Sequence, residues 1–153
     1  KIVILDPAPA LDLPDEIYGY ADWITPNETE ASSLVGFPIH TVDEAQKAAA
    51  VLLGRGAKQA IIKMGSNGAY WSDGRASQFV PAFSVKAVDS VGAGDAFNGG
   101  LAAALAEDRP VGEALQWAAA AGALSTTRHG AQPSMPGRAE VMQLIAQHSP
   151  RAS

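Results

Sequence analysis

The sequence predicts an α/β protein with a largely parallel sheet flanked by helices. Short β-branched apolar runs alternate with helical patterns along the first two thirds of the chain, and the last third reads as helices alone. Apolar residues make up 47% and charged residues 18% of the 153 residues, which argues against disorder and allows a buried core. No repeat, low-complexity segment or linker interrupts the pattern, so we expect one compact unit.

The chain opens with a predicted buried strand at residues 1–5, "KIVIL", because the run is continuously apolar and rich in β-branched residues. The following "DPAPA" ends it. A short helix over 13–21 begins at Pro14, and residues 22–25 form a brief strand. Because the sequence starts directly on a strand-like run, we expect it to be part of a larger sheet protein.

Two helices with clear start signals follow. The helix expected over 25–36 has Pro26 in its first turn, glutamates that suit the helix dipole and a closing glycine. The helix expected over 41–56 has an alanine-rich body and begins with a capping box, in which the Thr41 and Glu44 side chains bond each other's backbone amides.

The middle of the chain predicts strands and the end predicts helices. Residues 58–64 read as a buried strand, 68–80 as two short strands around the Asp73–Gly74 turn, and 83–89 as a further strand. Three helices are then expected, at residues 95–108, 111–129 and 137–148.

Composition excludes several classes of function. The net charge of -5 and the lack of a basic run argue against nucleic acid or an anionic membrane as a partner. The absence of cysteine excludes disulfides and thiolate metal sites. No apolar stretch reaches the ~18 residues of a membrane span, and the first residues are too short a run for a signal peptide. We therefore expect a cytoplasmic protein.

The segment "AVDSVGAGDAF" carries the chemistry. Gly92 and Gly94 stand at a strand-to-helix junction, where unpaired N–H groups at a helix start favour an anion such as phosphate. Asp95 beside this site would suit a base that takes the proton of an attacking hydroxyl. The alternative, a tight turn with Asp95 capping the helix, is about as well supported by the spacing alone.

Competing motifs do not fit. The chain has no G-x-x-x-x-G-K-[ST] and no G-x-S-x-G, and Phe97 stands where a dinucleotide fingerprint needs its third glycine. His40, His129 and His148 lack metal-ligand spacing and are expected at the surface. The three tryptophans show no cofactor pattern and are assigned to the core or to helix–sheet contacts.

The stretch "DSVGAGDAFNGGLAAAL" closely resembles the C-terminal signature of the PfkB, or ribokinase-like, carbohydrate kinases, D-x-x-G-A-G-D-x-F. "TPNETEA" is similar to that family's Asn-x-x-Glu motif, and "DPAPA", "GSNGAY" and "TRHGAQPSMP" resemble its ribokinase branch. The resemblance extends over about residues 1–147. It implies a ribokinase-like fold and makes residues 1–153 the C-terminal nucleotide-binding and catalytic portion, without the lid and N-terminal half.

The resemblance implies specific roles. Asp95 becomes the catalytic base, and the amides of Gly92, Ala93 and Gly94 become the anion hole for the γ-phosphoryl group. Glu30 would orient water on Mg²⁺. The implied nucleotide-binding residues are Asn27, Lys63, Met64, Gly65, Ser66, Asn67, Gly68, Gly94, Asp95 and Ala119.

Some of these positions have alternatives. Asn27 and Glu30 could serve only the electrostatics of a helix start. Lys63 replaces the small hydroxyl residue common in the family, so it would either contact phosphate or reach solvent. Ala119 replaces a larger polar residue near adenine, which leaves the choice of base open.

The resemblance also implies a monovalent cation site for K⁺, which would organise the glycine turn. Its ligands would be the Asp89 carboxylate, the Ser134 hydroxyl and the carbonyls of Val91, Ser125, Arg128 and Gly130. Alternatively, Asp89 only forms a turn and Ser134 only caps a helix.

The function that these observations favour is transfer of phosphoryl from ATP to a sugar hydroxyl, with ribose giving ribose 5-phosphate as the first choice. Alternatives are another acceptor (fructose, a keto-deoxy sugar acid or a nucleoside) or a nucleotide-binding module without activity. Since most sugar contacts would lie outside this chain, we expect it to be inactive alone. We also expect exposed surface that associates with the missing N-terminal half or forms a homodimer.

Overall fold

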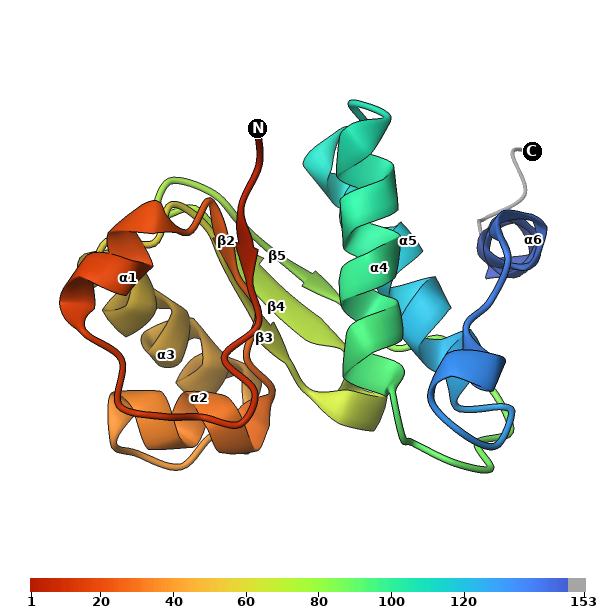
Figure 1. The fold of residues 1–153 in the computed structure, drawn as a ribbon, viewed down its shortest axis with the longest axis horizontal. Helices are drawn as coiled ribbons and strands as arrows, with labels where there is room; N and C mark the ends of the chain where they lie inside the picture. The colour runs from red at the N-terminus through yellow and green to blue at the C-terminus, as the bar shows by residue number, and fades with distance from the viewer. Residues whose placement is uncertain (149–153) are drawn as a thin grey trace. The chain divides into compact units, whose positions relative to one another are not determined.

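The structure, a computed structural model, describes residues 1–148 (Figure 1). The chain divides into two compact units, Lys1–Val80 and Pro81–Ser153. The sequence predicted a single compact unit, so this expectation was wrong. The division falls directly after the last strand of the sheet, where the chain continues as an extended segment with no regular secondary structure up to residue 90.

The first unit contains a five-stranded sheet in the order β1-β2-β3-β4-β5, with three α-helices. The elements in chain order are β1 (Ile4–Leu5), α1 (Asp15–Tyr20), β2 (Trp23–Ile24), α2 (Glu28–Val35), α3 (Val42–Gly54), β3 (Ala60–Lys63), a 3₁₀ turn (Gly65–Asn67), β4 (Ala69–Ser72) and β5 (Ser77–Val80).

Strand pairing divides the sheet into two parts. β1 pairs with β2 and β2 with β3 in parallel, with Ile24 opposite Ala60. β3, β4 and β5 pair antiparallel, and Ile62 lies opposite Tyr70. The predicted α/β class and the predicted hairpin at residues 68–80 are confirmed. The parallel part of the sheet is β1–β3.

The core of the first unit lies between its helices and the sheet. Tyr18 of α1, Leu34 of α2 and Leu52 of α3 pack in one buried cluster with Ile24 and Ile62 of the sheet. Figure 1 shows the three helices on the same side of the strands. Small alanines on α3 allow this helix to lie close to β3 and β4, because little side-chain volume separates the backbones.

Two of the three predicted helix starts in this unit, those of α2 and α3, are capped by side chains. Thr41 and Glu44 form the expected capping box at α3. At α2 a capping box also forms, but its cap is Asn27, so Pro26 lies before the helix and not in its first turn. α2 ends at Gly36, whose φ of 82° favours glycine.

Two predicted strands differ from the structure. Only Ile4 and Leu5 of the expected strand 1–5 are in the sheet, and Ile2 and Val3 are 51% and 41% exposed, because β1 has a single strand neighbour among the described residues. Residues 83–89 form no strand. Instead, the amides of Val88 and Asp89 both donate to the carbonyl of Thr126.

The second unit is helical, as predicted. It contains α4 (Ala93–Ala106), α5 (Val111–Ser125), a 3₁₀ turn (Gln132–Ser134) and α6 (Arg138–His148). α4 and α5 pack most closely at Gly100, where a Cβ atom would lie 2.8 Å from Ala121 Cβ and 2.9 Å from the Trp117 carbonyl oxygen. Glycine therefore sets the distance between these two helices.

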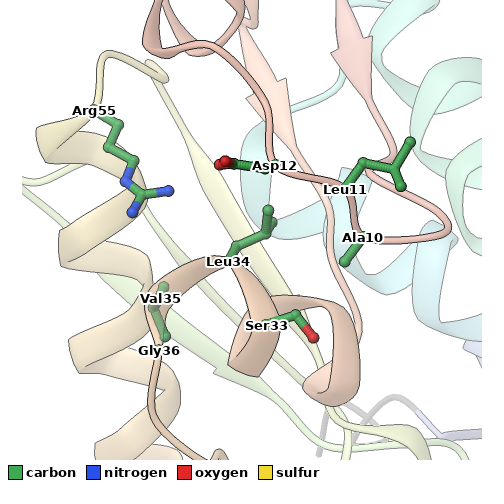
Figure 2. A pocket seen from close by; sticks show the side chains of 8 residues that line it. All are labelled: Ala10, Leu11, Asp12, Ser33, Leu34, Val35, Gly36 and Arg55. Atoms are coloured by element: carbon green, nitrogen blue, oxygen red, sulfur yellow. The ribbon is translucent and has the colours of Figure 1, made fainter.

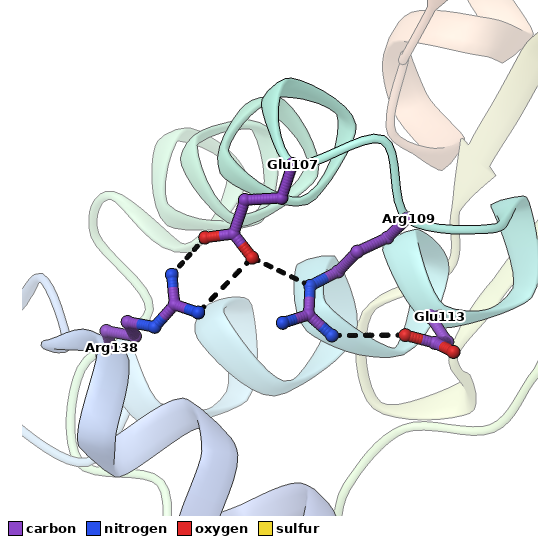
Figure 3. Close-up of polar contacts among 4 residues, drawn as sticks. All are labelled: Glu107, Arg109, Glu113 and Arg138. Atoms are coloured by element: carbon purple, nitrogen blue, oxygen red, sulfur yellow. Dashed lines mark hydrogen bonds and ion pairs between the residues drawn. The ribbon is translucent and has the colours of Figure 1, made fainter.

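A charged cluster joins the end of α4 to the starts of α5 and α6 (Figure 3). The Glu107 carboxylate accepts hydrogen bonds from Arg109 and Arg138, and Arg109 also bonds Glu113 at 3.1 Å. Both guanidinium groups lie over the ring of Trp117, at 4.4 and 5.3 Å from its centroid. The cluster thus combines ion pairs with cation–π contacts on a buried ring.

The structure bears out the assignment of the aromatic and imidazole side chains. Trp23, Trp71 and Trp117 are buried, and all three histidines are exposed. Within residues 1–148, no helix has the length and apolar character needed to cross a membrane.

The close approach at Gly100 predicts a specific sensitivity. Gly100→Ala should lower the free energy of unfolding by about 1–3 kcal/mol, because its Cβ meets backbone and cannot be relieved by a rotamer change. Denaturant unfolding measures this.

Gly99 on the same helix provides the matched control, since nothing lies within 4 Å of its Cβ position. Gly99→Ala should be neutral or stabilise by up to about 1 kcal/mol. Equal effects of the two substitutions would contradict the packing argument.

Candidate functional site

The turn before α4 depends on Gly92. This residue is the N-cap of α4 and has a φ of 80°, a backbone conformation that L side chains rarely adopt. A Cβ here would also lie 3.0 Å from Ala131 Cα. The positive φ and the lack of space for a Cβ atom therefore each require glycine at this position. Because residue 92 is glycine, the 89–92 turn can lie directly against the 130–131 segment.

The amides of this turn are only partly available to a ligand. Among residues 1–148, no backbone carbonyl accepts a bond from the N–H of Gly92 or Gly94. The Ala93 N–H, however, donates to the Ser90 carbonyl at 3.2 Å. Of the three amides predicted to form the anion hole, Ala93 is thus already engaged in a turn, and an anion would have to compete for it.

Asp95 lies in the first turn of α4 with an exposed side chain. It makes no hydrogen bond or ion pair with any residue that the structure describes, and α4 has no side-chain cap. The alternative prediction, that Asp95 caps the helix, is therefore wrong. Its carboxylate, next to the Gly94 amide in the chain, is accessible to solvent.

The Asp89 side chain stabilises the turn at residues 89–92. Its carboxylate accepts hydrogen bonds from the N–H groups of Val91 at 3.0 Å and Gly130 at 2.9 Å. The pKa of Asp89 is held below its ordinary value, chiefly by the hydrogen bond from the Gly130 amide. The bond from the Val91 amide and the nearby His129 imidazole lower it further. The turn-forming role that was left open for Asp89 is thus real, and it links two segments that are 41 residues apart.

The other predicted K⁺ ligands lie in the same part of the second unit. Ser125 and Ser134 are buried, and their hydroxyls donate to the carbonyls of Gly122 and Ala131. A donating hydroxyl keeps its lone pairs, so both oxygens can still face a cation. Within the described residues, three of the predicted carbonyl ligands accept no hydrogen bond: Val91, Arg128 and Gly130. Oxygen donors of this kind fit K⁺.

In the first unit, the predicted nucleotide-binding residues follow the carboxyl ends of β2 and β3. Asn27 and Glu30 form the α2 capping box, with both hydrogen bonds at 2.8 Å. The helix-start role proposed as an alternative is therefore present. Each side chain still has one polar atom that bonds no described residue, the Asn27 amide nitrogen and the second Glu30 oxygen.

Lys63 does not reach solvent, contrary to one of its two predicted roles. Its side chain is 11% exposed, and its ammonium lies 3.2 and 3.3 Å from the two carboxylate oxygens of Asp6, just after β1. Sequence reasoning missed Asp6, which it treated only as part of a strand-ending motif. The signal that could have identified it is its place directly after a strand of the parallel part of the sheet, at the edge where ligands bind.

The loop after β3 is a tight glycine turn. Gly65 and Gly68 have φ values of 52° and 121°, and the Met64 amide donates to the Gly68 carbonyl. Ser66 and Asn67 are exposed, whereas Met64 is buried in the core cluster. The Met64 side chain is therefore not available to a nucleotide. Ala119 of α5, predicted near adenine, is 8% exposed.

A shallow pocket of about 370 Å³ in the first unit involves none of the predicted site residues (Figure 2). It is lined by residues 10–12, the end of α2 and Arg55. The Arg55 guanidinium is held by the Tyr18 hydroxyl at 3.3 Å and by its ring. No sequence signal pointed to this pocket. The residues up to 148 also contain no cluster of three or more histidine, aspartate or glutamate side chains suited to a metal ion.

The structure contains a glycine turn before α4 and a capped Asn-x-x-Glu helix start at α2, the two motifs that the sequence resemblance singled out. A model of the pfkB family carbohydrate kinases matches residues 1–138, and the chain belongs to this family.

Particular relatives are ribose and deoxyribose kinases. The ribokinase of Haemophilus influenzae is 41% identical over 143 residues, which are 94% of this chain and 47% of that protein. The deoxyribokinase of Salmonella typhi is 42% identical over 135 residues, 88% of this chain and 44% of that protein.

A solved structure shows the same fold. Arabidopsis thaliana ribokinase complexed with ribose and ATP matches with a TM-score of 0.86 at 36% identity, over 94% of this chain and 47% of that one. The chain has the ribokinase-like α/β fold and spans about half the length of these relatives.

The two hydrogen bonds that the Asp89 carboxylate accepts predict a pH-dependent stability. Because the folded pKa is lowered, the stabilisation is present above the unfolded value, about pH 4, and is lost as the pH falls through the folded pKa. Asp89→Asn should therefore unfold at lower denaturant concentration than wild type at pH 7, with the difference shrinking below about pH 4.

Asp108→Asn is the matched control. Asp108 is exposed, lies in the same unit, and its carboxylate has no hydrogen bond within the described part of the chain. Its φ of 54° is one that asparagine also adopts, so this substitution should not lower the midpoint at either pH value. A gap between wild type and Asp89→Asn that persists unchanged at pH 3 would contradict the titration argument.

Proposed function

We propose that the chain is the C-terminal, nucleotide-binding and catalytic portion of an ATP-dependent sugar kinase. The observation that carries this proposal is the start of α4, where an unbonded Gly94 amide directly precedes the exposed carboxylate of Asp95. Family membership and the ribokinase relatives support it. Asp95 takes the proton of the sugar hydroxyl as the hydroxyl oxygen attacks the γ-phosphorus of ATP, and the bond from that phosphorus to the bridging oxygen breaks to release ADP.

The anion hole is proposed at Gly92, Ala93 and Gly94. Gly92 and Gly94 offer free N–H groups at the positive end of a helix, which favours the charge of a transferring phosphoryl group. Ala93 contributes only if its bond to Ser90 opens or is shared. The left-handed Gly92 keeps side-chain atoms out of the position where the phosphoryl oxygens would lie.

The first unit supplies further nucleotide contacts in this proposal. Its residues are Asn27, Lys63 and the loop 65–68, with Met64 acting through its backbone. Glu30 has one carboxylate oxygen left for a water on Mg²⁺, an ion that keeps several waters and prefers oxygen ligands. In the second unit, Ala119 on α5 leaves room beside the base.

K⁺ is proposed as an activating cation. The carboxylate of Asp89 and the oxygens of Val91, Ser125, Arg128, Gly130 and Ser134 supply its ligands. Because Asp89 already fixes the turn through two amides, a bound cation would act on the geometry of the anion hole and not on the sugar.

Ribose is the proposed acceptor, since ribokinases are among the most similar relatives and one binds ribose and ATP. A deoxyribokinase is equally similar, so deoxyribose belongs in the same test. The sugar contacts are proposed to lie outside this chain, in an N-terminal half with which it associates.

Asp95→Asn separates catalysis from binding. In the full-length gene product, the substitution should reduce phosphoryl transfer by about 10²–10⁴-fold, because the general base is lost while the amides remain. Calorimetry with a non-hydrolysable ATP analogue, with and without Mg²⁺, should give nearly unchanged affinity. Joint loss of binding and activity would assign Asp95 to structure, and absence of any transfer by wild type to a panel of sugars would favour a silent nucleotide-binding module.

Replacement of K⁺ by tetramethylammonium at constant ionic strength should lower the thermal unfolding midpoint of the chain and, in the full-length product, its activity. The organic cation is too large for a site of carbonyl and carboxylate oxygens. Asp89→Asn should abolish the difference between the two salts. An unfolding midpoint that is the same in both salts for wild type would argue against the cation site.

A further inference from the structure

A partly buried ion pair lies at the carboxyl ends of two parallel strands. Lys63 is the last residue of β3, and Asp6 directly follows β1. The ammonium approaches both oxygens of the carboxylate, at 3.2 and 3.3 Å, and the side chains are 11% and 24% exposed. The two residues are 57 positions apart, so the pair exists only in the folded sheet.

Its surroundings are those of a ligand-binding edge. The Lys63 amide donates to the Pro26 carbonyl at 2.9 Å, and Lys63 forms a parallel bridge with Asn27, the cap of α2. The glycine turn Gly65–Gly68 begins two residues later. In open α/β sheets, ligands bind outside the carboxyl ends of the parallel strands, and the pair stands at that edge.

The chemistry of the pair leaves a donor for a ligand. An ammonium has three N–H groups, and the carboxylate of Asp6 occupies at most two of them. Without Asp6, the ammonium of the buried lysine would lose the carboxylate that offsets its removal from water. Since buried ion pairs add little net stability compared with apolar residues of similar size, stability alone is a weak reason for this pair.

We infer that Asp6 is a positioning residue, which holds the Lys63 ammonium so that its remaining N–H donates to a phosphate oxygen of the Mg²⁺-bound nucleotide. This inference rests on the proposed function and adds a residue that the sequence motifs do not include. The pair as a whole is neutral. Lys63 can therefore donate a hydrogen bond in a fixed direction without leaving an unpaired charge in the protein.

Side-chain NMR of the lysine ammonium groups tests the inference on the unaltered chain. The Lys63 signal, assigned in the wild-type chain by through-bond correlation to the backbone of Lys63, should shift when Mg²⁺-bound β,γ-imido-ATP is added and should stay in place with adenosine. Lys58 is the internal control, because its pair with Asp22 is exposed at the lysine and should not respond to either ligand.

The affinity of variants for the ATP analogue distinguishes a positioning role of Asp6 from a purely electrostatic effect of its charge. Lys63→Thr should weaken binding of the ATP analogue by about 10-fold or more, as expected for loss of a charge-assisted hydrogen bond. Asp6→Asn should also weaken it, because the ammonium is no longer held, whereas removal of a negative charge alone would tighten binding of a polyanion. Lys58→Thr should leave the affinity within about two-fold of wild type.

The outcomes are distinct. A Lys63 signal that does not move while the analogue binds, or tighter binding by Asp6→Asn, would overturn this inference and leave the proposed function intact. If wild type binds no nucleotide at all, the proposed function fails and this inference with it. Because the spectroscopic arm uses the wild-type chain, a folding defect in either variant does not prevent a decision.

Discussion

The unsatisfied amides at the first turn of α4 are the constraint on which the candidate chemistry depends. A helix start leaves N–H groups without partners, and most proteins cover them with a polar side chain. Here the cap is Gly92, which brings no such group. The turn packs tightly against Ala131, and the Asp89 carboxylate bonds the Gly130 amide. These contacts fix the turn in a conformation in which the Gly92 and Gly94 amides have no backbone partner among the described residues.

The starts of α2 in the first unit and α4 in the second unit differ in how their unpaired N–H groups are treated. At α2 the Asn27 and Glu30 side chains satisfy the first amides reciprocally, so the positive end of that helix is occupied. At α4 it is left free. An anion such as a phosphoryl group is therefore favoured at α4 by the backbone itself, while α2 presents side-chain oxygens and suits a hydrated cation.

Local signals predicted the helices and the glycine turn well, because caps and special backbone angles are properties of neighbouring residues. The strand predictions were weaker. Residues 83–89 have strand composition, but their amides bond Thr126, a choice that depends on where a distant helix ends. The partnership of Lys63 with Asp6 likewise arises from strand order. The resemblance to the family rests on Asp95 and its glycines, whose roles stay predictions, whereas the hydrogen bond from the Ala93 amide to the Ser90 carbonyl depends on the folded backbone.

The charged cluster around Glu107 has a consequence for the last helix. α6 buries only Val141 and Leu144, so little apolar area holds it. Most of its specific attachment comes from Arg138, through Glu107 and the face of Trp117, together with the Arg128–Glu140 pair. Such contacts between partly exposed charges are screened by dissolved ions. The attachment of α6 therefore depends on the ionic strength of the solution, whereas the packing of the apolar core of the second unit does not.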